Sequence, residues 1–134
     1  MVAELQARKF RCTRCQAVLT VAPAETLSRR LYSAAAIAWA LALYGLSLLA
    51  PEAVRKLVSP WQVVAASSAT RWRTLSRWCA AATAGLFTKL LPLTGTTARQ
   101  VAAAAATAIS AFAVPVPEPP PLAVLAFHGA ARAA

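Results

Sequence analysis

Two cysteines in the stretch KFRCTRCQAVLTV have the spacing of a metal-binding or thiol-containing turn. Cys12 and Cys15 are separated by two residues, and short apolar or β-branched runs lie on both sides. This pattern predicts a strand, a tight turn and a second strand. Two thiolates supply half of the four ligands that a structural zinc site requires. The pair is therefore either half of a site completed by ligands from elsewhere, or two partly exposed thiols on a hairpin.

The remaining side chains that could do chemistry are few and scattered. The sequence contains no Asp, and its acidic residues are Glu4, Glu25, Glu52 and Glu118. Two-metal phosphoryl transfer needs a carboxylate cluster, and no such cluster is visible. Nucleophilic catalysis lacks an obvious base, because the only histidine is His128. We therefore predict a protein without catalytic activity of its own.

The charge balance points to a polyanionic partner. Fourteen Lys and Arg residues stand against four acidic residues, which gives a formal net charge of +10. Such a field attracts nucleic acid and anionic membrane surfaces alike. Three cysteines are too few for a disulfide scaffold, so a reducing, cytoplasmic compartment is expected.

An arginine- and threonine-bearing face is the most informative feature. Ser67 and Ser68 can cap a helix that runs to about Gly85. At about 100° per residue, one narrow arc of this helix holds Thr70, Arg73, Thr74 and Arg77. The opposite side, which we expect to pack, holds Trp72, Leu75, Cys79 and Ala82. Guanidinium and hydroxyl groups at this spacing suit a helix in a DNA major groove. The alternative is a solvated basic face.

Two earlier elements must position this helix. In YSAAAIAWALALYGLSLLAPEAV, Ser33 predicts a helix start, Gly45 a stop, and Pro51 the first turn of another helix. The second helix carries Arg55 and Lys56. The loop that follows is longer than the turn of a minimal helix-turn-helix, and Trp61 could anchor it in the core.

The same uncharged stretch is also just long enough to cross a membrane, for which about 20 apolar residues are needed. Its apolar residues are spread around the helix, which favours either a membrane span or a helix buried on all sides. The turn signals at Gly45, Ser47 and Pro51 favour a chain that turns and packs.

The C-terminal part predicts a further Ala-rich helix and a tail. Residues 97–113 place Val101, Ala105, Ala108 and Phe112 on one stripe. The stretch VPVPEPPP predicts an extended linker, followed by one short terminal helix. The predicted segments are a hairpin over 1–22, a helix-turn-helix-like domain over 23–85, a loop and Ala-rich helix over 86–113, and a Pro-rich tail with a short helix over 114–134.

The expected fold is therefore mostly α. A short N-terminal β-hairpin, equivalent to half a zinc ribbon, precedes a three-helix, helix-turn-helix-like bundle, which is followed by the Ala-rich helix and the Pro-rich tail.

The chain resembles the N-terminal region of bacterial insertion-sequence transposases and related small helix-turn-helix proteins. The resemblance lies in the order of three segments, FRCTRCQAVLTVAP, RRLYSAAAIAWAL and SATRWRTLSRW. The resemblance covers residues 8–82. It implies duplex DNA binding, with recognition residues at Arg71, Arg73, Thr74 and Arg77.

The sequence departs from that pattern at two places. The family's zinc ribbon has two Cys-x-x-Cys turns, whereas this chain has one, and Gln16 stands where such a turn usually carries Gly. Zinc is therefore expected only if other ligands are supplied. Without any Asp the acidic catalytic residues are missing too, which indicates a transposase-related protein or mobile-element remnant.

We expect a DNA-binding helix-turn-helix protein, cytoplasmic and nucleoid-associated in a bacterium, in which a homodimer is compatible with the motif. Arg55, Lys56 and Arg99 would approach phosphates while the arginine-bearing helix reads base edges. The alternative is a small basic single-pass membrane protein, or an accessory subunit of a membrane complex, whose flanks contact anionic lipid.

Overall fold

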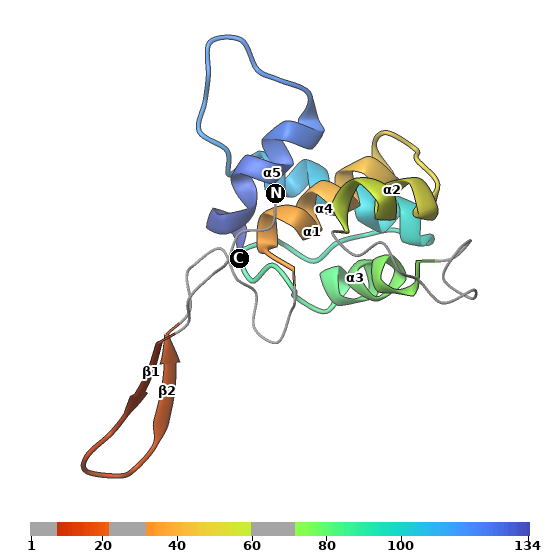
Figure 1. The fold of residues 1–134 in the computed structure, drawn as a ribbon. Coiled ribbons are helices and arrows are strands. Elements are labelled where there is room, and N and C mark those ends of the chain that lie inside the picture. Colours follow the sequence, from red (N-terminus) through yellow and green to blue (C-terminus); the bar gives the residue numbers. More distant parts are fainter. Residues whose placement is uncertain (1–7, 22–31, 60–71) are drawn as a thin grey trace.

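Helix α1 (Ala34–Gly45) is the central element of a mostly helical protein (Figure 1). The computed structural model describes residues 8–21, 32–59 and 72–134. Ser33 caps α1 by accepting a hydrogen bond from the Ala36 amide at 3.1 Å. No residue of α1 is fully exposed, because α2, α3, α4 and α5 all pack against it. The lack of charge in this segment is therefore explained by burial on all sides.

The chain turns after Gly45, as the sequence predicted. Leu48 adopts the left-handed conformation at φ 56°, and helix α2 (Pro51–Val58) then begins at the proline. The uncharged stretch over residues 32–54 is thus split between two helices. Of these, α1 spans about 18 Å at 1.5 Å per residue. None of the helices in the described ranges combines the length and apolar composition that a membrane span needs.

Three helices form the main core. α1, α4 (Ala98–Ser110) and α5 (Leu122–Ala133) pack on one another more extensively than any other helices in the described ranges. α4 starts with a capping box, in which Thr97 accepts from the Gln100 amide and the Gln100 side chain accepts from the Thr97 amide. The terminal helix, expected as a short tail element, is instead a twelve-residue component of this core.

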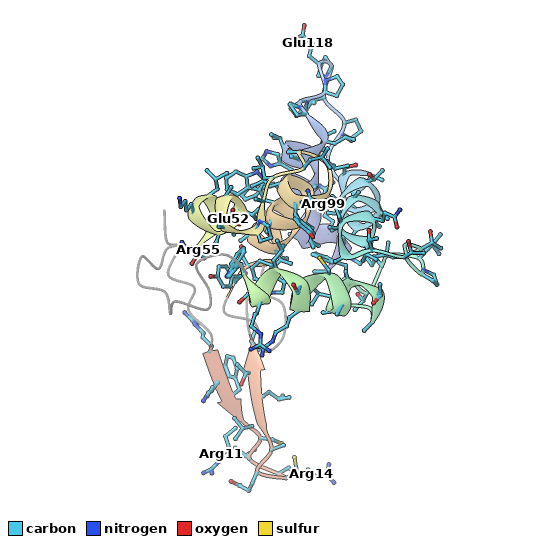
Figure 2. All side chains as sticks on the ribbon, turned by 90° about the vertical axis from the view of Figure 1, so that its right-hand side faces the viewer. Arg11, Arg14, Glu52, Arg55, Arg99 and Glu118 are labelled. Atoms are coloured by element: carbon cyan, nitrogen blue, oxygen red, sulfur yellow. The ribbon has the colours of Figure 1, made fainter. Side chains whose placement is uncertain are left out.

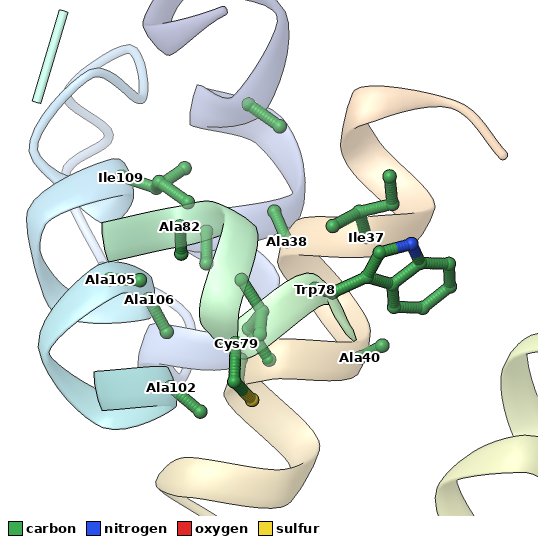
Figure 3. Packing of buried hydrophobic residues seen from close by; sticks show 14 of the residues in the cluster. Ile37, Ala38, Ala40, Trp78, Cys79, Ala82, Ala102, Ala105, Ala106 and Ile109 are labelled. Carbon is green, nitrogen blue, oxygen red and sulfur yellow. The ribbon is translucent and has the colours of Figure 1, made fainter. Parts of the chain in front are cut away.

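Small residues let these helices approach closely. A Cβ atom added at Gly45 would lie 2.3 Å from the Ala103 backbone nitrogen, and one added at Gly129 would lie 2.1 Å from the Ile109 carbonyl oxygen. Gly45 therefore serves helix packing as well as marking the end of α1. Alanines occupy most of the other positions in this interface, as Figure 3 shows for α1 and α4.

Helix α3 (Arg73–Thr83) packs against α4 and α1, whereas α2 packs mainly against α1. Figure 1 shows α3 below α1 and α4, with α2 beside α1. In the described ranges, the two helices of the expected helix-turn-helix are thus joined through α1 rather than through a large mutual interface.

The N-terminal hairpin is confirmed. Strands β1 (Arg8–Arg11) and β2 (Val18–Val21) pair antiparallel, with Arg8 opposite Val21 and Arg11 opposite Val18. Every residue of both strands is exposed, and the hairpin projects away from the helices (Figure 1).

Some predicted features lie outside the described residues. These are the caps at Ser67 and Ser68, the Trp61 anchor, and the start of the arginine-bearing helix before Trp72. The described helix begins at Arg73, where Trp72 makes no side-chain capping bond.

Candidate nucleic-acid interface

Helix α3 has one buried face and one exposed face. The predicted packing side is confirmed, because Trp72, Leu75, Cys79 and Ala82 are all buried. Arg73 and Arg77 are exposed and Thr74 is half-buried. Sequence reasoning did not assign Trp78, which is also buried, although its spacing of three residues from Leu75 places it on the same side. Figure 3 shows Trp78 and Cys79 at the contact of α3 with its neighbours.

An aromatic cluster fixes where α3 lies. Tyr32, Trp72 and Trp78 form three edge-to-face contacts, with ring centroids 4.9 Å apart for Tyr32–Trp78 and 5.1 Å for Trp72–Trp78. The Tyr32 hydroxyl lies 3.0 Å from the Ser59 hydroxyl oxygen. Edge-to-face pairs of this kind stabilise by about 0.5–1.5 kcal/mol beyond their buried area. These contacts therefore hold together the start of α1, the end of α2 and the buried face of α3. The exposed arginines thus stand on a helix whose position is fixed by packing.

The surroundings of the exposed arginines contain little negative charge. Neither α3 nor the hairpin contains an acidic residue. The acidic residues within the described ranges are Glu52 on α2 and Glu118 in the Pro-rich segment. Figure 2 shows Glu118 at the opposite end of the molecule from Arg11 and Arg14 of the hairpin. Among the described residues, the end of the molecule that carries the hairpin therefore has basic and no acidic side chains.

The two cations of α2 differ in their freedom to bind. Lys56 is exposed, whereas Arg55 is half-buried. The Arg55 Nε atom is buried and has no hydrogen-bond partner among the described residues. Lys56 is thus the better placed of the two to reach a phosphate. The predicted contacts Thr70 and Arg71 lie outside the described residues.

Arg99, which was expected to approach phosphates, makes contacts within the protein. Its guanidinium group donates to the Tyr44 carbonyl oxygen at 2.6 Å and to the Leu49 carbonyl oxygen at 3.4 Å. It also lies 4.2 Å from the centroid of the Tyr44 ring. Arg99 is labelled in Figure 2. The Tyr44 carbonyl lies in the last turn of α1, where no following turn of helix can bond it, and the Leu49 carbonyl lies in the segment between α1 and α2. Arg99 is therefore a structural residue that joins α4 to α1.

The hairpin turn, residues 12–17, is here called the thiol turn. The Cys12 amide donates to the Ala17 carbonyl at 2.8 Å, and the Gln16 amide donates to the Cys12 carbonyl at 2.9 Å. Hydrogen bonds to its thiol from the backbone N–H groups of Cys15 and Arg14 lower the pKa of Cys12. Gln16 takes the left-handed conformation at φ 60°, which is the conformation that glycine serves in such turns. Cys12 is half-buried and Cys15 is exposed.

The third cysteine is separate from this turn. Cys79 lies in the core, where burial raises its pKa from 9.0 to about 11. No group of three or more His, Cys, Asp or Glu side chains close enough to hold a metal ion occurs among the described residues. The thiol turn of one chain thus supplies two ligands and no more.

Comparisons with models of protein families, with curated proteins and with solved structures found no match to this chain.

Proposed function

We propose that the protein binds duplex DNA through the exposed face of α3, and that it has no catalytic activity of its own. The observation that carries this proposal is the position of Arg73 and Arg77. Both are exposed on a helix whose opposite face is locked into the core by Trp72, Leu75 and Trp78. A rigid helix with outward guanidinium groups has the form that enters a major groove, where Arg forks onto guanine O6 and N7.

The charge distribution supports the same partner. The absence of carboxylates from α3 and from the hairpin leaves the exposed cations Arg8, Lys9, Arg11 and Arg14 unopposed within those elements. Phosphate contacts from such cations give affinity and register, whereas base contacts from the helix give specificity. In this proposal the chain is related to the DNA-binding part of insertion-sequence transposases, as its sequence resemblance suggests.

A selection of binding sites from a random duplex library, followed by affinity measurements, tests the proposal. Replacing Arg73 with Ala should lower the preference for one base position by about 1–3 kcal/mol. Lys56→Ala should weaken binding to all sequences alike, because it removes a phosphate contact. Arg132→Ala serves as the control, since Arg132 is an exposed arginine on α5. Binding without sequence preference that Arg73→Ala leaves unchanged would disprove the role of α3.

A further inference from the structure

The thiol turn has the geometry of a metal-binding turn. The Cys12 amide donates to the Ala17 carbonyl and the Gln16 amide donates to the Cys12 carbonyl, which closes a tight turn around the two cysteines. Gln16 takes the left-handed conformation that ends this turn. Neither cysteine is fully buried, since Cys12 is half-buried and Cys15 is exposed. The Gln16 side-chain amide donates to the Thr13 carbonyl at 3.2 Å and braces the turn further.

One chain does not fit a closed tetrahedral site. Structural zinc takes four ligands, which are almost always Cys or His. The full sequence offers only two other such residues, Cys79 and His128. Cys79 lies on the buried face of α3, and His128 lies on α5 with its ring 5.5 Å from that of Phe127. In the part of the chain that the structure describes, neither residue joins Cys12 and Cys15 in a group that could hold a metal ion.

The hairpin carries an apolar face that nothing covers in the described structure. The strand register places Phe10, Leu19 and Val21 on one face, and their side chains are 54%, 64% and 58% exposed. Arg8 lies at the end of this face, opposite Val21. An isolated two-stranded hairpin is at best marginally stable in water. The half-complete ligand set and the uncovered face thus lie on the same element, and a second hairpin of the same kind would complete both.

We propose that two copies of this chain bind one zinc ion between their hairpins, with Cys12 and Cys15 of each copy as the four ligands. Each thiol releases its proton on binding, so the metal faces four thiolates. The apolar faces containing Phe10, Leu19 and Val21 pack together at the same interface. This inference does not depend on DNA binding.

The charge of the hairpin makes the association metal-dependent. Each hairpin carries Arg8, Lys9, Arg11 and Arg14, so two metal-free hairpins repel each other. Zinc with four thiolates carries a net charge of −2, which offsets part of that repulsion. The metal-free protein should therefore remain monomeric, and zinc should drive the dimer.

Zinc titration of the reduced full-length chain, followed by molar mass and metal content, tests this proposal without DNA. We expect one zinc ion for every two chains and a shift from monomer to dimer. Cys12→Ser and Cys15→Ser should each abolish both effects, whereas His128→Ala should change neither. Helical circular dichroism shows whether each variant remains folded, because the helical core does not include the hairpin.

Phe10→Ala provides a second, independent variant. It should weaken dimerisation while leaving a ratio of one zinc ion to two chains in the dimers that form. One zinc ion bound per monomer, or no zinc bound by the reduced chain, would overturn the proposal.

Discussion

At the scale of single residues, Arg99 is a cation whose charged group is engaged within the protein. Its guanidinium group reaches across from α4 to the Tyr44 and Leu49 carbonyls and lies over the Tyr44 ring. Hydrogen bonds to a charged group contribute about 1.5–3 kcal/mol. Arg99 therefore links α4 to the last turn of α1 and to the segment that leads into α2, at a partly buried position.

Replacing Arg99 with Met keeps the aliphatic stem but removes these bonds. We expect the free energy of unfolding to fall by about 2 kcal/mol, because the two carbonyl groups lose their charged donor. Urea denaturation followed by circular dichroism measures the change. Arg132→Met is the matched control, and its stability should stay within about 0.5 kcal/mol of the wild type, since the residue is exposed. Equal stability of Arg99→Met and the control would contradict the structural role.

The burial of Cys79 should make the free energy of unfolding fall at alkaline pH. Burial raises its pKa in the folded state from 9.0 to about 11, whereas the unfolded chain has no such burial. Between these values the unfolded thiol loses its proton and the folded thiol keeps it. The stability that this difference provides is therefore present below pH 9 and is lost as the pH rises towards about 11.

The free energy of unfolding of the wild type and of Cys79→Ala should be compared from pH 8 to pH 11. Because Lys and Tyr titrate in both proteins, only the difference between the two reports on Cys79. We expect the wild type to lose stability relative to Cys79→Ala as the pH rises. A difference that stays constant over this range would show that Cys79 is not desolvated in the folded state.

At the scale of elements, the fold depends on how closely α1 and α4 approach each other. Gly45→Ala would place a Cβ atom 2.3 Å from the Ala103 nitrogen and 2.7 Å from the Ala102 carbonyl carbon. Backbone atoms cannot rotate away, so the helices must separate. We expect a loss of about 1–3 kcal/mol of stability in chemical denaturation.

The sign of the stability change in Gly45→Ala shows whether the close contact with α4 exists. Within a helix, Ala is favoured over Gly by about 1 kcal/mol. A neutral or stabilising Gly45→Ala variant would therefore show that Gly45 only ends α1 and that the close contact with α4 does not exist.

Most helices and strands were predicted correctly, because helix caps and turns depend on a few residues that are neighbours in the sequence. Ser33, Gly45 and Pro51 placed the ends of α1 and the start of α2, and the Cys-x-x-Cys segment predicted the hairpin. The packing face of α3 was predicted because its buried residues recur at helical spacing. These features need no knowledge of the tertiary structure.

Tertiary contacts between distant segments were not predictable in the same way. The role of Arg99 depends on carbonyl groups 50 and 55 residues away in the chain. The terminal helix was expected as a tail, because its alanines give little local sign that they fill a tight core against α1 and α4. Trp78 was missed as the partner of Tyr32, although its spacing from Leu75 could have indicated burial.

At the scale of the whole molecule, the apolar core and the exposed cations lie on different elements. The Ala-rich core of α1, α4 and α5 has no buried charged or polar residue among those described. The exposed cations of α3 and the hairpin stand on elements without acids, and Glu118 lies at the opposite end (Figure 2). This asymmetry would orient the protein on a polyanion before any specific contact forms.

The salt dependence of duplex DNA binding tests the central claim most directly. Each phosphate neutralised contributes about 0.9 to the slope of log affinity against log salt concentration. If Arg73 and Arg77 contact the duplex, the Arg73→Ala/Arg77→Ala variant should bind more weakly than the wild type. It should also show either a slope reduced by up to about two or, where the arginines read bases, a loss of sequence preference. Arg132→Ala should leave affinity, slope and preference unchanged. A double variant that matches the wild type in affinity, slope and sequence preference would contradict the account.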